Sequence, residues 1–171
     1  MLSKKLQYNI INLNEFVIKN KLVFVDKALG VYDVYIKKAS LMLRREIKQH
    51  DNVIISGHLA PYLLVPNQID LVVVLRRSPE YLLQTYRERN YTMTKIRDNI
   101  AAEIVGISLY DNIKKFGEEK IIQFDTTTTS SDEIIRRLTK SLINKSLRRA
   151  EEIDWIPTLK DKPDILKLVS Y

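Results

Sequence analysis

The sequence predicts an α/β fold with a parallel β-sheet, and three stretches carry this prediction. Residues 53–56 and 71–75 are short apolar runs, and neither alternates apolar with polar residues. Strands of this kind are covered by helices on both faces, as in parallel sheets. Residues 79–89 change to helical spacing, with Leu82, Leu83 and Tyr86 spaced to face inward. The chain is therefore expected to run strand, crossover, strand, helix.

Polar residues follow both predicted strands at their carboxyl ends. Ligands of parallel α/β sheets bind at that edge, because the strand ends and the loops after them converge there. The sequence therefore predicts a functional edge formed by Ser56, Gly57, His58, Arg76 and Arg77.

Length and composition are those of an ordinary globular chain. With 171 residues, 45% hydrophobic and 29% charged, the simplest expectation is one domain with a sizeable core. The absence of cysteine excludes a disulfide framework and thiolate metal sites. No apolar run has the length of a transmembrane helix, and the first residues do not resemble a signal peptide. A cytoplasmic protein is expected.

A net charge of +7 predicts affinity for anions such as nucleotides, RNA or an acidic protein face. The excess is uneven, since basic residues crowd the helix expected over residues 131–149. They are Arg136, Arg137, Lys140, Lys145, Arg148 and Arg149. Contact of this helix with RNA or the ribosome is one interpretation, and a well-solvated basic surface is the other.

The N-terminal part is expected to mix short elements. Residues 1–6 read as the end of a helix, because no capping residue precedes them. A strand at 9–13 leads into a helix capped by Asn14, and a basic amphipathic helix spans 36–50. Residues 20–36 mix aromatic with acidic side chains and are expected to be irregular.

The C-terminal part is expected to contain one long helix over residues 91–116 that ends at Gly117. A last strand at 120–125 follows. Ser130 has capping-box spacing before the basic helix, and a tail at 151–171 packs across the domain. The isoleucines expected on the inner face of the long helix are Ile96, Ile100, Ile104 and Ile107.

One continuous stretch carries a family resemblance. Residues 89–104, RNYTMTKIRDNIAAEI, resemble without a gap the lid segment of the small adenylate-kinase-like, broad-specificity nucleoside monophosphate (NMP) kinases of archaea and eukaryotic nuclei, a group associated with small ribosomal subunit maturation. Asn90 replaces the family's glycine, and asparagine also adopts left-handed backbone conformations. The likeness continues in short pieces over about the first 150 residues. The lid pattern falls on Arg89, Tyr91, Lys95, Asp98, Asn99, Ala102 and Glu103.

The resemblance implies a P-loop NMP-kinase fold, a three-layer sandwich around a parallel sheet. Residues 1–150 would form the core, with an NMP-binding region at 12–35 and a short ATP lid at 88–98, and residues 151–171 a C-terminal extension. The implied enzyme is an adenylate kinase, which transfers the terminal phosphoryl group of ATP to AMP or another NMP. ATP and Mg²⁺ are the implied cofactors, and ATP hydrolysis is a side activity.

The same resemblance assigns roles to single residues. His58 and Arg89 would be catalytic, because a planar guanidinium suits a phosphoryl oxygen that gains charge during transfer. Without the resemblance, Arg89 reads as half of a surface ion pair and His58 as a structural histidine. The implied NMP-binding residues are Asn12, Glu15, Asp26, Tyr32 and Tyr35. The implied ATP-binding residues of the lid and base loop are Arg89, Lys95, Asp125 and Thr126; no residue is assigned to a metal.

The chain departs from the family pattern at three places. Ser56 stands where an acidic residue is expected, so Mg²⁺ would be held through water or by another carboxylate. The family's acidic cluster does not follow Asp26, which leaves the choice of NMP open. None of the four glycines belongs to a G-x-x-x-x-G-K-[ST] phosphate loop. The family's central first strand lies between the strands resembled by 53–56 and 71–75, and we expect that this strand and the P-loop lie in about 15 to 20 residues ahead of Met1.

The implied partners are ATP, AMP or another NMP, ribosomal protein uS11 and pre-rRNA, which places the chain in ribosome biogenesis and rRNA processing. No membrane is implied. One alternative is a non-catalytic ribosome-assembly or RNA-contacting module, because the phosphate loop and its lysine are absent from the sequence. Another alternative is a basic α/β domain with no nucleotide role.

Overall fold

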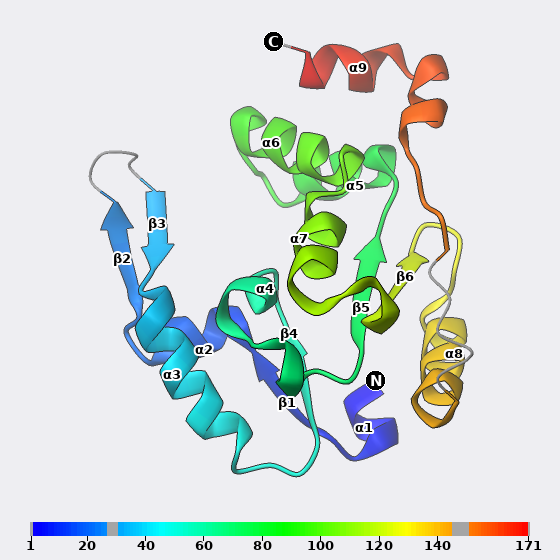
Figure 1. The fold of residues 1–171 in the computed structure, drawn as a ribbon. Coiled ribbons are helices and arrows are strands. Elements are labelled where there is room, and N and C mark those ends of the chain that lie inside the picture. The colour runs from blue at the N-terminus through cyan, green and yellow to red at the C-terminus, as the bar shows by residue number, and fades with distance from the viewer. Residues whose placement is uncertain (1, 27–30, 145–150, 171) are drawn as a thin grey trace. The chain divides into compact units, whose positions relative to one another are not determined.

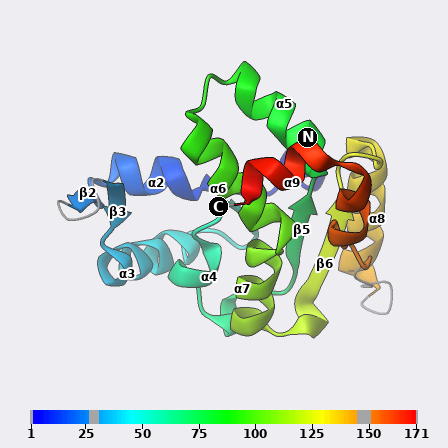
Figure 2. The same cartoon turned by 90° about the horizontal axis from the view of Figure 1, so that it is seen from above.

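The fold consists of two compact units, residues 1–69 and 70–171 (Figures 1 and 2). Each unit combines helices with one pair of parallel strands, so the predicted α/β class with parallel pairing is confirmed. The computed structural model describes residues 2–26, 31–144 and 151–170. For Asp26 and Val31 it describes the backbone only.

The first unit contains a parallel pair of strands, β1 (Asn9–Asn12) and β4 (Val53–Ser56). The register places Asn12 beside Ser56, so the carboxyl ends of the two strands meet. Helix α3 (Ile36–Ile47) precedes β4 and buries Ala39 and Leu43, as its amphipathic pattern predicts. The other helices of this unit are α1 (Leu2–Leu6), α2 (Leu13–Lys19), α4 (Ala60–Leu63) and the 3-10 turn η1 (Pro66–Gln68).

The prediction that residues 20–36 are irregular was wrong for the part of this stretch that the structure describes, residues 20–26 and 31–36. Strands β2 (Val23–Asp26) and β3 (Val31–Val34) pair as an antiparallel hairpin. The rings of Phe24 and Tyr35 contact each other, with their centroids 4.5 Å apart. β-Branched and aromatic residues favour strands, and the acidic residues interspersed among them obscured this signal in the sequence.

The cap of α2 is Asn12 rather than Asn14. The Asn12 Oδ1 accepts hydrogen bonds from the backbone N–H groups of Asn14 and Glu15, at 3.0 and 3.3 Å. Because β1 ends at Asn12, one residue earlier than predicted, the side chain that closes the strand also begins the helix. Leu13, the first helical residue, is then fully buried.

The second unit contains β5 (Val72–Arg76), paired in parallel with β6 (Ile121–Asp125). Helix α5 (Pro79–Glu88) follows β5, and Leu82, Leu83 and Tyr86 pack inward as predicted. The remaining elements of this unit are α6 (Met93–Ile104), α7 (Ile107–Phe116), η2 (Glu118–Lys120), α8 (Ser131–Ile143), η4 (Ile156–Asp161) and α9 (Pro163–Val169).

The long helix predicted over residues 91–116 is broken into α6 and α7. Gly106 has a φ of +68° between them, a conformation that glycine adopts without a steric penalty. Ile96 and Ile100 are buried as predicted, but the break turns Ile107 outward, where it is 48% exposed. The isoleucine spacing therefore described α6 correctly and failed beyond the glycine.

Local signals predicted α8 well. The Ser130 hydroxyl accepts a hydrogen bond from the Glu133 backbone N–H at 3.3 Å, which confirms the predicted cap. Three basic residues predicted in this helix, Lys145, Arg148 and Arg149, lie outside the described residues.

Strand pairing leaves edges in both units. Among the described residues, β4 is hydrogen-bonded only to β1, and β5 only to β6. Leu75 of β5 is 58% exposed, so the prediction that helices cover both faces of this strand was wrong at that position. That a further strand belongs beside β4 and β5 stays a prediction. No helix within the described ranges has the length and apolarity needed to cross a membrane.

Candidate functional site

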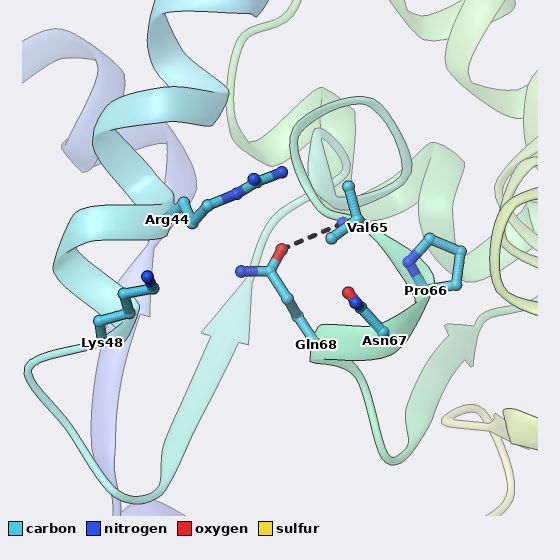
Figure 3. A pocket seen from close by; sticks show the side chains of 6 residues that line it. All are labelled: Arg44, Lys48, Val65, Pro66, Asn67 and Gln68. Carbon is cyan, nitrogen blue, oxygen red and sulfur yellow. Dashed lines mark hydrogen bonds between the residues drawn. The ribbon is translucent and has the colours of Figure 1, made fainter.

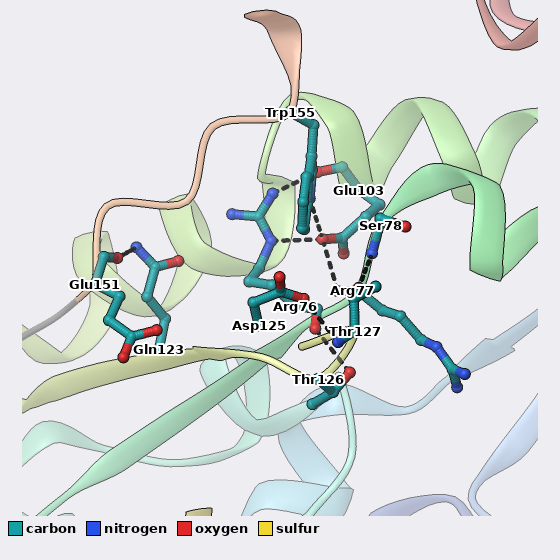
Figure 4. A network of polar contacts seen from close by, with 10 residues as sticks. All are labelled: Arg76, Arg77, Ser78, Glu103, Gln123, Asp125, Thr126, Thr127, Glu151 and Trp155. Carbon is teal, nitrogen blue, oxygen red and sulfur yellow. Dashed lines mark hydrogen bonds and ion pairs between the residues drawn. The ribbon is translucent and has the colours of Figure 1, made fainter. Parts of the chain in front are cut away.

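A buried ion pair lies at the carboxyl end of β5 (Figure 4). The Arg76 side chain is 3% exposed, and its Nε donates to the Glu103 Oε1 at 2.6 Å. Its Nη2 donates to the Glu103 backbone oxygen at 2.7 Å. The Trp155 indole N–H donates to the same carboxylate oxygen at 2.9 Å. Strand β5, helix α6 and the C-terminal segment therefore meet at the Glu103 carboxylate.

The loop after β6 is tied to the end of β5. Both the backbone N–H and the hydroxyl of Thr126 donate to the Arg76 backbone oxygen, each at 2.8 Å. The Asp125 carboxylate accepts from the Thr127 N–H at 2.7 Å, which closes the turn. The Thr127 hydroxyl in turn accepts from the Ser78 N–H at 2.8 Å. The predicted base-loop residues Asp125 and Thr126 are thus held rigidly at the strand edge.

Two polar groups at the start of α5 stay unsatisfied. The Ser78 hydroxyl and the Arg77 Nε are buried and have no hydrogen-bond partner among the described residues. The Arg77 guanidinium lies 5.6 Å from the centroid of the Tyr81 ring. Arg76 and Arg77 were both predicted at this edge, and their side chains differ in their contacts. Arg76 is engaged internally, whereas the charge of Arg77 points away from the Glu103 network (Figure 4).

The predicted lid residues surround the turn between α5 and α6. Arg89 ends α5 and is exposed, and Asn90 has a φ of +54°, the left-handed conformation expected of a residue that replaces glycine. The Lys95 ammonium lies 3.9 Å from the centroid of the Tyr91 ring, which stacks on Tyr86. The turn therefore presents two cations, Arg89 and Lys95, beside an aromatic pair.

Burial raises the pKa of the Tyr86 phenol above 10, and the nearby Glu103 carboxylate adds to this shift. A raised acid pKa means that the folded state resists ionisation of this phenol. The stability that Tyr86 contributes is therefore complete below pH 10 and is lost as the pH rises through the folded-state value. We expect Tyr86→Phe to flatten the loss of stability above pH 10, as measured by urea unfolding at several pH values. Tyr110→Phe, at a 62% exposed site, should leave the slope unchanged.

In the first unit, the carboxyl ends of β1 and β4 carry the other predicted residues. The Asn12 amide donates to the Glu15 carboxylate at 3.0 Å, so these two predicted NMP-binding residues are neighbours. Ser56 lies opposite Asn12 in the strand register, and Gly57 and His58 follow it. His58 is exposed and has no hydrogen-bond or ion-pair partner within the described part of the chain, which leaves its imidazole open to a ligand.

Gly57 makes this edge sensitive to substitution. Its φ is +139°, and an added Cβ would lie 3.0 Å from the Cβ of the fully buried Leu13. We expect Gly57→Ala to lower the free energy of unfolding by about 2 kcal/mol, because backbone strain and a steric contact act together. Gly106→Ala is the comparison, since its Cβ would meet only ordinary contacts at 3.5 Å. Equal losses in chemical denaturation would contradict the role given to Leu13.

The hairpin carries the remaining predicted NMP residues. Tyr32 is 81% exposed and Tyr35 52% exposed, so both rings are accessible. The backbone of Asp26 ends β2, but its side chain lies outside what the structure describes. The structure therefore places these residues on the hairpin without joining them to a pocket.

A separate pocket of about 600 Å³ lies beside α3 (Figure 3). The Gln68 side-chain oxygen accepts from the Val65 N–H at 3.2 Å, so its amide N–H groups remain available. Arg44 and Lys48 of α3 line the opposite side of the pocket (Figure 3), and neither has an ion-pair partner within the described ranges. Cations and N–H donors that have no carboxylate partner attract anions. The lining residues are Arg44, Lys48, Val65, Pro66, Asn67 and Gln68.

Sequence reasoning missed the central part played by Glu103 and Trp155. Glu103 was identified only as part of the lid pattern, and Trp155 only as part of a tail. A signal was present, because Glu103 stands three residues after Ile100 on the inner side of α6, where a carboxylate needs a cationic partner. That this cationic partner is Arg76, 27 residues away, could not be predicted from the sequence.

Metal binding by the protein alone finds no support among the described residues, since none of their His, Asp and Glu side chains form a group of three or more. Oxygen atoms at the β1–β4 edge come from Ser56 and Glu15.

Comparison with known proteins gives consistent matches. The family model described as "AAA domain" matches residues 1–106. A Pyrococcus abyssi protein is 32% identical over 155 residues, which cover 91% of this chain and 81% of the relative. A Pyrococcus furiosus protein is 29% identical over a match that covers 98% of this chain and 88% of the relative. A Thermococcus gammatolerans protein is 27% identical over a match that covers 91% of this chain and 82% of the relative. All three are named "Putative adenylate kinase".

Proposed function

This chain belongs to the AAA domain family and to the family of the archaeal proteins named putative adenylate kinase, and from that premise we propose that it is an NMP kinase. The proposed reaction is reversible transfer of the terminal phosphoryl group from MgATP to AMP or another NMP. Hydrolysis of ATP is the side reaction, in which water replaces the acceptor. The observation that carries the proposal is the lid turn, which offers Arg89 and Lys95 together on an exposed surface.

The proposed chemistry is positioning combined with charge stabilisation, because phosphoryl transfer requires little covalent participation by the protein. The loop of Asp125 and Thr126 would hold the base of ATP, supported by its hydrogen bonds to the end of β5. Arg89 would contact the phosphates through its planar fork of N–H donors, with Lys95 adding a second positive charge.

The acceptor would bind through residues of the first unit. Asn12, Glu15, Asp26, Tyr32 and Tyr35 are the proposed NMP ligands. His58 is the proposed catalytic histidine, supported by its exposure and its lack of a partner among the described residues.

A role in small ribosomal subunit maturation belongs to the same proposal, with ribosomal protein uS11 and pre-rRNA as partners in the cytoplasm. The net charge of +7 supports contact with RNA. Arg44 and Lys48 at the α3 pocket, which have no ion-pair partner among the described residues, offer a surface for such contacts.

A coupled assay with MgATP and AMP tests the catalytic proposal on the 171-residue chain and on the same chain extended ahead of Met1 by a segment with a P-loop. We expect the extended form to produce ADP in a reaction that depends on both nucleotides, with slower ADP formation from ATP alone. We expect no turnover by the 171-residue chain, because its sequence has no phosphate loop. Saturable protection of the chain against thermal unfolding by ATP or AMP gives an independent measure of binding. Protection without turnover by the extended form would refute catalysis and retain nucleotide binding.

A second candidate is a non-catalytic ribosome-assembly or RNA-contacting module. It is favoured by one observation, that none of the four glycines lies in a G-x-x-x-x-G-K-[ST] motif. RNA binding whose affinity falls steeply with salt, together with no turnover of ATP by either form, would establish this candidate instead.

A further inference from the structure

We propose that the C-terminal strap, residues 155–169, positions the lid hairpin, with Trp155 as a positioning residue. The lid hairpin comprises α5, α6 and the turn of residues 89–92 between them. This inference rests on the proposed function, since the lid matters only if a nucleotide binds there. It assigns a role to the segment that neither the lid pattern nor the matched AAA domain, residues 1–106, includes.

The strap holds α6 along its length. Near the end of α6, the Trp155 N–H donates to the Glu103 Oε1 at 2.9 Å. Nearer the start, Leu159 and Ile165 pack against the fully buried Ile96 and Ile100. Because the two contacts lie at different turns of the helix, α6 cannot tilt without breaking at least one of them.

The strap also holds α5. Lys162 forms an ion pair with Glu80 in the first turn of α5, and this contact raises the pKa of Lys162. Further along α5, Leu82, Leu83 and Tyr86 join the same apolar cluster as Leu159 and Ile165. Figure 1 shows α9 alongside these two helices. One segment therefore contacts both arms of the lid hairpin.

Within the turn, Tyr91 packs against the same apolar cluster and stacks on Tyr86. Arg89 and Asn90 are exposed, so their placement follows from the two helices on either side. Displacement of a phosphate-contacting group by about 1 Å can slow a reaction by about 100-fold. The Glu103 Oε1 also accepts from Arg76 at the end of β5, so lid, strap and strand edge share one acceptor atom. A change in the lid angle must therefore alter the surroundings of the Trp155 indole.

Trp155 is the only tryptophan in the chain, so intrinsic fluorescence reports on this junction directly. The full 171-residue chain would be titrated with MgATP, with tryptophan emission and calorimetry recorded in parallel. We expect a saturable change in emission with the dissociation constant that calorimetry gives. Trp155→Phe keeps an aromatic ring but removes the N–H donor, and we expect it to weaken MgATP binding about 10-fold.

Ile156→Ala is the matched control, because this neighbour is 59% exposed and contacts neither Glu103 nor the buried cluster. It should bind MgATP as the native chain does. The inference would be overturned if calorimetry showed that MgATP binds, tryptophan emission did not change and Trp155→Phe bound MgATP with native affinity. That outcome would leave the proposed function intact. No binding of MgATP by calorimetry would overturn both. The emission titration uses the native chain and decides the question even if Trp155→Phe fails to fold.

Discussion

Glu103→Gln is expected to lower the free energy of unfolding by about 3 kcal/mol, the largest stability effect that the structure predicts. The substitution leaves the Arg76 guanidinium, 3% exposed, without a negative partner. The neutral amide oxygen also accepts weaker hydrogen bonds from Trp155 and Arg76 than a carboxylate does. Urea unfolding followed by circular dichroism would measure the change.

The exposed pair Arg136–Glu133 provides the matched control. Its Arg136 Nη2 to Glu133 Oε1 distance is 2.7 Å, close to that of the buried pair, but its side chains are 57% and 36% exposed. Glu133→Gln should leave stability unchanged within error, because water screens exposed pairs. A double variant, Arg76→Met with Glu103→Leu, should recover part of the loss, because no buried charge is left unpaired. Equal effects of the two single substitutions would contradict the importance of burial.

Arg89→Lys is expected to lower kcat for ADP formation by about 1,000-fold, the largest effect on activity. Lysine keeps the positive charge but loses the planar fork that can contact two phosphate oxygens at once. The loss should appear mainly in kcat rather than in KM, because the guanidinium contact strengthens as charge develops during transfer. Steady-state kinetics of the extended form with varied ATP and AMP would separate the two.

Arg87→Lys is the corresponding control. Arg87 is also exposed and lies two residues earlier on α5, outside the lid turn. It should retain native kinetics. If Arg89→Lys also retained them, Arg89 would be a surface residue of the lid, and the catalytic role proposed for it would be wrong.

Elements with strong local signals were predictable from the sequence. The cap at Ser130 depends on atoms three residues apart, and the inward face of α6 depends on spacing within two turns. Errors arose where one pattern masked another. Isoleucine spacing continued past Gly106 although the helix did not, and acidic residues hid the strands of the hairpin.

The candidate site was predictable only in part. The turn between α5 and α6 was predicted as a lid because its residues lie close together in one stretch, and the left-handed Asn90 agrees with its place in that pattern. That this turn is an ATP lid stays a prediction. The anchoring of Asp125 and Thr126 to the end of β5 required the register of two strands that lie about 50 residues apart. The roles of His58, Arg89 and the NMP-binding residues stay predictions.

By itself, the sequence determined the α/β class, the apolar strands and the closeness of the cations Arg89 and Lys95, because these depend on residues within a few turns of one another. Only the tertiary structure decided that Glu103 pairs with Arg76 and accepts the Trp155 N–H, and that Leu75 is left exposed. The physical reason is that burial and charge pairing are properties of segments that meet in space. Trp155 is 52 residues from Glu103 along the chain, and nothing in its local sequence specifies that contact.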